Sequence, residues 1–167
     1  MLMREIVVIA HDIRSTHNVG SLLRTCEGLG LEHVYLTGYT PYPAVEHGET
    51  RLPHIAAKLT RQIQKTALGA DTMVSWTHDE DIRSRIVQLK QAGYAVVALE
   101  QTAQSIPLPD YPPPDKVALL LGREVEGIDP EILALCDAAV EIPMSGRKES
   151  FNVVQAAAMA LYHLRFA

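Results

Sequence analysis

The sequence predicts an α/β fold in which helices flank a mostly parallel six-stranded sheet. Short apolar runs rich in Val, Ile, Leu and Ala recur along the chain, and such runs are typical of strands covered on both faces. Segments with helical spacing of apolar residues lie between them, and this alternation favours a parallel sheet. At 167 residues, the chain is most simply one domain spanning residues 1–167.

The first elements follow this pattern in order. The run EIVVIA at Glu5–Ala10 predicts the first strand. The segment NVGSLLRTCEGLG has apolar residues at helical spacing, and Asn18 is placed to cap that helix. HVYL at His33–Leu36 predicts the second strand. Residues 37–53 contain three prolines and two glycines, and this turn-rich stretch is long enough to suspect a functional loop.

The rest of the chain continues the alternation. A proline-rich connection at 106–114 is expected to be a loop within the domain. The other expected elements are helices at about 54–67, 79–91 and 130–135, and strands at 73–76, 95–99, 117–121 and 138–142.

The last helix is unusually apolar. It follows the loop Met144–Glu149 and begins near Ser150 and Asn152, residue types that accept hydrogen bonds from the free amides of a first turn. Its polar residues are only Gln155, His163 and Arg165. A helix apolar nearly all round is buried on more than one side. We therefore expect the sheet on one side of this helix and a second copy of the protein on the other.

Composition limits the possible classes of protein. Fifteen basic and twenty acidic residues give a net charge of −5, which argues against a generic nucleic-acid coat but allows a local basic patch. The apolar runs are too short for a membrane span, and the N-terminal run is too short and too soon charged for a signal peptide. Cys26 and Cys136 lie in apolar helical patterns, so we expect buried free thiols and a cytoplasmic location.

One helix carries a candidate basic face. Its basic side chains recur at helical spacing, and no acidic residue occurs between Arg51 and Ala70. The residues of this face are His54, Lys58, Arg61 and Lys65. The alternative interpretation is an ordinary solvated helix surface.

Several familiar sites are missing from the sequence. It has no G-x-G-x-x-G after a strand, no P-loop, no H-E-x-x-H and no G-x-S-x-G. Three loops remain, and each directly follows an apolar strand. They are the segments 18–24, 121–127 and 142–152. Because ligands of open α/β sheets bind outside the carboxyl ends of the strands, these loops are expected to converge on one crevice.

Together the three loops resemble a known family. The first reads Asn18-x-Gly20-x-x-x-Arg24-Thr25, the second LGREVEGI with Gly122, Glu124 and Gly127, and the third IPM-x-G followed by Ser150-x-Asn152-Val153. These motifs resemble those of the SpoU/TrmH-type RNA 2′-O-ribose methyltransferases, of the trefoil-knot (SPOUT) superfamily. The chain departs from the family at Phe151, where Leu or Met is more usual, and around Gln155, where a Ser is common.

The resemblance implies a C-terminal trefoil knot with the last helix threaded through a loop. It implies an S-adenosylmethionine site, with S-adenosylhomocysteine as product and no metal. The implied cofactor-binding residues are Leu99, Gly122, Ile142, Met144 and Ser150. It also implies an RNA substrate, with tRNA the first expectation and rRNA the second, and a homodimer formed through the first and last helices. With no N-terminal RNA-binding extension expected, the catalytic domain would itself recognise RNA.

The same resemblance assigns the activating role to Arg24. We expect Arg24 to position the RNA phosphate and ribose and to stabilise the developing alkoxide, because a guanidinium stays charged at neutral pH. Asn18, Glu124 and Asn152 would orient Arg24 and the ribose. The alternative for Arg24 is a surface ion pair with Glu27 or Glu124.

The RNA is expected along the basic helix. The expected RNA-binding residues are Arg14, Arg51, Lys58, Arg61 and Lys65. Two alternatives to a tRNA-modifying enzyme are an rRNA 2′-O-methyltransferase and a non-catalytic knotted protein that binds RNA or a nucleotide.

Overall fold

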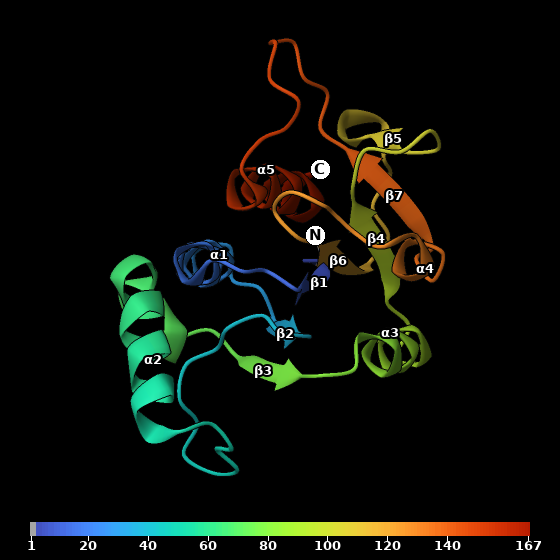
Figure 1. Cartoon of the computed structure of the whole chain (residues 1–167). Coiled ribbons are helices and arrows are strands. Elements are labelled where there is room, and N and C mark those ends of the chain that lie inside the picture. The colour runs from blue at the N-terminus through green and yellow to red at the C-terminus, as the bar shows by residue number, and fades with distance from the viewer. Residues whose placement is uncertain (1–2) are drawn as a thin grey trace.

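The computed structural model describes residues 3–167 and shows a seven-stranded parallel sheet with helices on both faces (Figure 1). The strands are β1 Glu5–His11, β2 His33–Thr37, β3 Trp76–Asp79, β4 Ala95–Leu99, β5 Ile106–Pro107, β6 Lys116–Leu121 and β7 Ala138–Glu141. Their order across the sheet is β3-β2-β1-β6-β4-β7-β5, and every strand pair is parallel. The predicted fold class is confirmed, and the predicted count of six strands is wrong by one.

Five α-helices cover this sheet. They are α1 Thr16–Gly28, α2 Pro53–Ala67, α3 Ile82–Gln91, α4 Pro130–Leu133 and α5 Val153–Phe166. Figure 1 shows α1, α2 and α5 on one side of the sheet and α3 and α4 on the other. No helix within residues 3–167 is long and apolar enough to cross a membrane.

Residues 6–10 of strand β1 are all apolar and buried because both faces of the strand are covered. Successive side chains of a strand point to opposite faces of the sheet. Ile6 and Val8 are fully buried in the core cluster that includes residues of α1 and α5. Val7 and Ile9 are buried in the second cluster, which includes residues of α3. A strand covered on both faces has no position for a solvated polar side chain.

Two strand predictions need correction. The seventh strand, β5, lies in the proline-rich connection that was expected to be a loop. Its two residues pair with β7 at the edge of the sheet, where a proline costs no ladder hydrogen bond, and two residues are too few to show a periodicity. The strand expected at 73–76 begins only at Trp76, because a 3₁₀ turn at Ala70–Thr72 precedes it. This edge strand, WTHD, is largely polar and hence gave no apolar run.

Two helices start elsewhere than expected. Ser15, not Asn18, caps α1: its hydroxyl accepts a hydrogen bond from the amide of Asn18, which lies in the first turn. Helix α3 begins at Ile82 instead of residue 79, because the Asp81 carboxylate accepts hydrogen bonds from the amides of Arg83 and Ser84. The predicted cap of α5 at Asn152 is confirmed, with its side chain accepting from the amides of Val154 and Gln155.

The C-terminal end of α5 is fixed by a buried arginine. The guanidinium of Arg165 donates hydrogen bonds to the backbone carbonyls of Arg4, Leu29 and Gly30 and lies 3.6 Å from the carboxylate of Glu32. The side chain is only 1% exposed. Buried charge is costly unless it is paired and hydrogen-bonded, and Arg165 meets both conditions. The final helix is thereby joined to the first strand and to the end of α1.

Gly20 sets the distance between α1 and α2. A Cβ atom at this position would lie 2.2 Å from the carbonyl oxygen of Ile63 and 2.2 Å from the hydroxyl oxygen of Thr66. Since one of these atoms belongs to the backbone, the helices would have to move apart to admit a side chain. The glycine of the first motif therefore has a packing role in the fold.

We expect Gly20→Ala to lower the free energy of unfolding by about 1–3 kcal/mol, as overpacking does in other cores. Urea denaturation followed by circular dichroism measures this change. Gly28→Ala is the matched control, because nothing lies within 4 Å of the added Cβ at that position in the same helix. Equal stability of the two variants would contradict the packing role of Gly20.

Candidate active site

The loops that follow β4, β6 and β7 meet at one cavity of about 310 Å³, beside the start of α5. A volume of this size is typical of small-molecule sites, and the position matches the rule that ligands bind at the carboxyl ends of parallel strands. Its lining includes all five residues predicted to bind the cofactor, namely Leu99, Gly122, Ile142, Met144 and Ser150.

The walls of this cavity combine apolar surface with negative charge. Leu121 and Val153 add apolar surface beside the five predicted residues. Four glutamates also contribute to the lining, at positions 100, 124, 141 and 149. Among the residues that the structure describes, no group of three or more His, Cys, Asp or Glu side chains is placed to hold a metal ion. Such walls suit an organic ligand that has a flat apolar part and carries positive charge.

Glu124 is held by the start of α1. Its carboxylate accepts hydrogen bonds from the backbone amides of Arg14, at 3.1 and 3.2 Å, and of Ser15, at 3.1 Å. Partial burial pushes the pKa of Glu124 upward, but these two amides and the side chain of Asn18 outweigh it and hold the pKa below its ordinary value. Both amides lie just before Thr16, the first residue of α1, with Ser15 as its N-cap. Glu124 therefore fixes the chain where it enters the helix, near the positive end of the helix dipole.

A chain of hydrogen bonds joins the three sequence motifs. The Asn18 side-chain nitrogen donates to Glu124 at 3.2 Å, and the Asn152 side-chain nitrogen donates to the Asn18 oxygen at 3.3 Å. The oxygen of Asn152 meanwhile caps α5. Three of the four residues predicted to be catalytic are thus brought into direct contact.

The fourth, Arg24, lies apart from this chain. Its side chain is exposed on α1, between one and two turns beyond Asn18, and does not line the cavity. Within residues 3–167 it makes no ion pair, so the alternative of a surface salt bridge to Glu27 or Glu124 is not supported. Glu124 is already occupied by the start of α1.

Sequence reasoning missed Glu100. Its carboxylate accepts hydrogen bonds from the amides of Ile128, at 2.9 Å, and Gln101, at 3.0 Å, and it lines the cavity. It ties the loop after β4 to the loop after β6. Its position in the sequence could have identified it, because it directly follows the strand at 95–99 and so lies at the same edge of the sheet as the motif loops.

The predicted RNA-binding residues fall into two groups. Lys58, Arg61 and Lys65 are exposed on α2, and Arg14 is exposed beside Glu126, with 2.7 Å between their charged groups. Arg51 differs, because its guanidinium donates to both oxygens of Glu49 and to the carbonyls of Tyr42 and Pro43. These bonds leave Arg51 little to offer to a phosphate and make it a tie within the loop that follows β2.

Comparison with known proteins shows the family of this chain. The model of the SpoU rRNA Methylase family matches residues 5–162. The chain therefore belongs to the SpoU rRNA Methylase family.

Two relatives carry names that specify a reaction. The tRNA (guanosine(18)-2′-O)-methyltransferase of Aquifex aeolicus is 24% identical over 95% of this chain and 68% of its own length. The enzyme of the same name from Thermus thermophilus is 29% identical over 95% of this chain and 73% of its own length.

Solved structures agree on the fold. The AdoMet-bound rRNA methyltransferase from Sinorhizobium meliloti superimposes with a TM-score of 0.79 at 24% identity, over 98% of this chain and 57% of that one. A structure solved to study the 2-OH methylation of C/U34 on tRNA gives a TM-score of 0.72 at 20% identity, over 96% of this chain and 94% of that one. The chain spans a little over half of the first structure and nearly all of the second.

We expect Glu124→Gln to lower the free energy of unfolding at pH 7 by about 1 kcal/mol, because the amides of α1 lose their charged acceptor. The lowered pKa of Glu124 means that its contribution is present above the pKa of the unfolded chain and is lost as the pH falls through the folded-state pKa. The difference between wild type and variant should therefore shrink as the pH is lowered below the ordinary glutamate pKa of about 4.3.

Urea denaturation over this pH range measures the difference. Glu131→Gln is the control, because Glu131 is 81% exposed and pairs only with Arg83 at the surface. A stability difference for Glu124→Gln that persisted unchanged at low pH would contradict the carboxylate's role.

Proposed function

We propose that this protein is an S-adenosylmethionine-dependent RNA 2′-O-ribose methyltransferase that acts on tRNA. The observation that carries the proposal is the contact of Glu124, Asn18 and Asn152, which joins one residue from each family motif beside the cavity. Family membership and the names of the Aquifex and Thermus relatives support the same reaction and substrate.

The cavity fits the cofactor in shape and charge. Leu99, Ile142 and Met144 offer apolar surface for an adenine, and backbone groups of the loops lie beside it. Glu100 and Glu124 supply negative charge suited to a sulfonium and an ammonium group. Ser150 and Gly122 complete the predicted lining. These residues are the ones we propose to bind S-adenosylmethionine, and the threading of α5 through a loop is part of what the family implies.

The bound cofactor supplies an electrophilic methyl group: the ribose 2′-oxygen forms a bond to the methyl carbon, the sulfur–carbon bond breaks, sulfur keeps the electron pair, and the hydroxyl proton leaves to water. The protein must align the hydroxyl for this in-line attack. Alignment alone can account for up to roughly 7–11 kcal/mol of barrier reduction in favourable cases.

Arg24 is proposed to hold the RNA. Its guanidinium is exposed and stays charged at neutral pH, so it can bind a phosphate and stabilise the developing alkoxide. Asn18, Glu124 and Asn152 are proposed to orient the ribose, because their mutual hydrogen bonds fix their side chains in place.

The basic face of α2 is proposed as the path of the RNA. Lys58, Arg61 and Lys65 are exposed, and no ion pair engages them within the described chain. They lie on the same side of the sheet as α1, which carries Arg24 (Figure 1). That placement supports the proposal that this domain itself recognises RNA.

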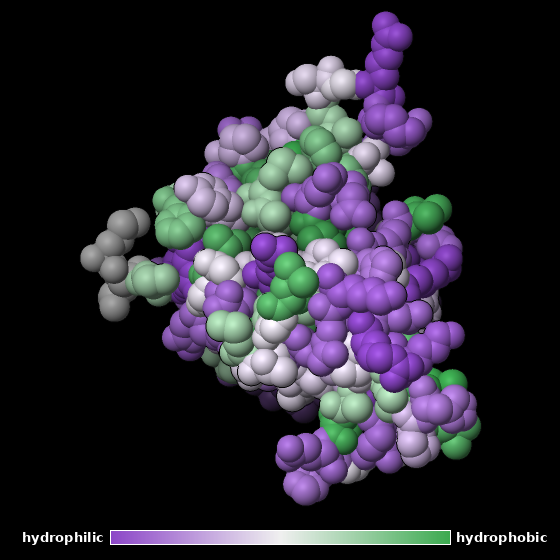
Figure 2. All heavy atoms as spheres, turned by 90° about the vertical axis from the view of Figure 1, so that its left-hand side faces the viewer, coloured by the Kyte–Doolittle hydropathy of each residue, from purple (hydrophilic) through white to green (hydrophobic). Residues whose placement is uncertain are grey.

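A homodimer through α1 and α5 is proposed from exposed apolar side chains. Met159, Tyr162 and Phe166 on α5 are 38%, 62% and 57% exposed. Figure 2 shows apolar residues gathered on this face at the level of α5, while hydrophilic residues cover much of the rest. A cytoplasmic location is proposed from the free thiols of Cys26 and Cys136.

We expect Arg24→Ala to reduce the rate of methyl transfer to bulk tRNA by at least about 100-fold, because the positive group proposed to bind the RNA phosphate and to stabilise the developing alkoxide is lost. The affinity for S-adenosylmethionine should stay within a few fold of wild type. Transfer of a tritiated methyl group measures the first quantity and calorimetry the second.

Arg83→Ala is the control, since Arg83 is also exposed and does not line the cavity. Unimpaired turnover by Arg24→Ala would contradict its role. Wild-type transfer to bulk rRNA but not to tRNA would identify an rRNA enzyme, and cofactor binding without transfer to either RNA would identify a non-catalytic protein.

We expect the triple variant Lys58→Ala, Arg61→Ala and Lys65→Ala to weaken tRNA binding and to reduce the slope of log affinity against log salt by about two to three. A matched triple variant, Arg83→Ala, Lys90→Ala and Lys116→Ala, removes the same charge from side chains that are ion-paired away from α2. Filter binding at several salt concentrations compares the two. If both triple variants changed tRNA affinity and salt slope equally, the α2 face would be an ordinary solvated surface.

A further inference from the structure

A second cavity, of about 430 Å³, lies outside the site described above. We propose that it binds an unpaired nucleobase of the RNA substrate, next to the nucleotide that is methylated, by stacking on Tyr39. The inference rests on the proposed function, because it assumes that RNA crosses the neighbouring site.

A hydrogen bond links the linings of the two cavities. Arg14 and Thr16 line the second cavity, and the amide of Arg14 is bonded to Glu124, which lines the first. A nucleotide whose ribose reaches Glu124 and Asn18 therefore places its neighbour in the chain close to the second cavity. The leucine of α2 that lines it, Leu59, lies beside Lys58 of the basic face.

The lining has the composition of a base-binding pocket. Tyr39, Tyr42 and His78 provide aromatic rings, and the exposed Arg14 provides positive charge. Within residues 3–167, no acidic side chain contributes to the lining. Unpaired bases are commonly held on aromatic rings, while cationic groups hold the adjacent phosphates. Because no carboxylate lines this cavity in the described part of the chain, the lining favours an anionic polymer such as RNA over a cationic partner.

Of the two tyrosine rings, Tyr39 is the one that is free to stack. The faces of Tyr42 are covered by His78, stacked at 4.0 Å between ring centroids, and by the guanidinium of Arg51, 3.6 Å from the ring centroid. These three side chains pack on one another and form one side of the cavity. Tyr39 is 54% exposed and, among the described residues, makes no aromatic pair. Its ring is the available stacking surface.

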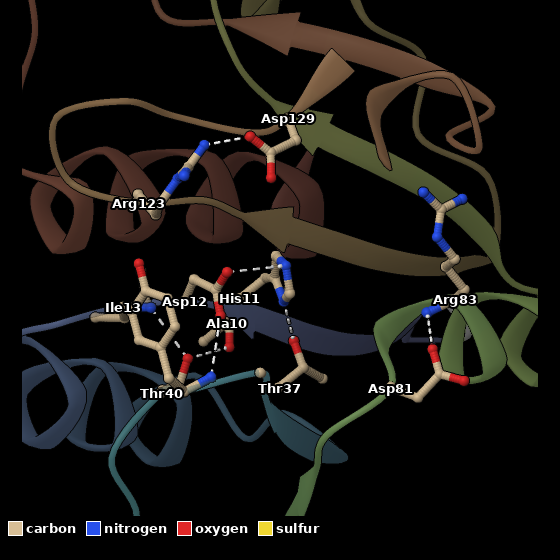
Figure 3. A network of polar contacts seen from close by, with 12 residues as sticks. Ala10, His11, Asp12, Ile13, Thr37, Thr40, Asp81, Arg83, Arg123 and Asp129 are labelled. Carbon is tan, nitrogen blue, oxygen red and sulfur yellow. Dashed lines mark hydrogen bonds and ion pairs between the residues drawn. The ribbon is translucent and has the colours of Figure 1, made fainter. Parts of the chain in front are cut away.

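The backbone beneath Tyr39 is rigidly held at the end of β1. Asp12, in the left-handed region at a φ of 54°, accepts a hydrogen bond from the Tyr39 amide at 3.0 Å. Gly38 has a φ of 64°, and a Cβ there would lie 2.0 Å from the Asp12 carboxylate, so only glycine fits. Buried Thr40 donates to the carbonyl of Ala10 and accepts from the amide of Ile13 (Figure 3).

An exposed aromatic side chain on so fixed a backbone is preorganised for binding. A loop held only for stability would need no half-exposed tyrosine near its start, whereas a stacking platform loses less entropy when its backbone is already ordered. Arg14 lies at the rim, paired at the surface with Glu126, an exposed contact that is readily exchanged for a phosphate.

The test compares Tyr39→Leu, Tyr39→Phe and Arg14→Ala in tRNA binding and methylation. Tyr39→Leu should weaken binding of bulk tRNA and raise its KM by about tenfold, with an unchanged salt slope, because stacking is lost but no charge is removed. Tyr39→Phe should keep wild-type values. Arg14→Ala should reduce the salt slope by about one, and Arg83→Ala should not. All four variants should bind S-adenosylmethionine as wild type does.

Tyr39→Trp supplies a direct signal for stacking. Its emission should fall on addition of bulk tRNA, compared with wild type, in which Trp76 is the one tryptophan of the sequence. Wild-type affinity and KM for Tyr39→Leu, or an unquenched Tyr39→Trp at saturating tRNA, would overturn the inference.

The experiment separates this inference from the proposed function. If wild type methylates tRNA but Tyr39→Leu behaves identically, only the base pocket is wrong. If wild type binds tRNA without methylating it, the proposed reaction is wrong, and the affinity of Tyr39→Leu still decides the pocket. If neither tRNA nor rRNA binds, both proposals fail.

Discussion

The carboxylate of Glu124 is the contact on which the rest of the site depends. It accepts from two backbone amides at the start of α1 and, through Asn18, reaches Asn152 at the start of α5. The first helix is far in sequence from both the loop after β6 and the last helix, yet one acidic side chain aligns all three. An apolar residue at this position would leave the amides of Arg14 and Ser15 without this acceptor. A lysine or arginine there would be repelled by the positive end of the helix dipole.

The sequence predicted the features whose physical requirements impose a recognisable pattern of residues, either an apolar run or a short motif. Strands buried on both faces must be apolar, so β1 and β6 could be recognised, and the loops at their carboxyl ends had to converge. All five residues expected around the cofactor line one cavity. The failures share a cause as well: β5 and β3 lie at the edges of the sheet, where pairing imposes little on side chains, and their sequences are short or polar.

Contacts set by tertiary structure left no such trace. Arg51 reads as one more basic residue beside a basic helix, but the structure turns it inward onto Glu49 and Tyr42. Tyr39 lies in a loop with no periodicity, and its exposure depends on Asp12 and Gly38 meeting across two strands. Glu100 binds an amide 28 residues away. Each of these residues acquires its role only once distant backbone segments are fixed, which local spacing does not encode.

The buried guanidinium of Arg165 has a consequence for the order in which parts of the fold can be completed. It holds the carbonyl of Arg4, 161 residues earlier, so the docking of α5 joins two segments that are far apart in the chain. Helix α5 also supplies one side of the cavity near its start. The cavity is therefore complete only in molecules in which α5 has docked on the sheet. A ligand that binds only the complete cavity would stabilise the docked state of this helix.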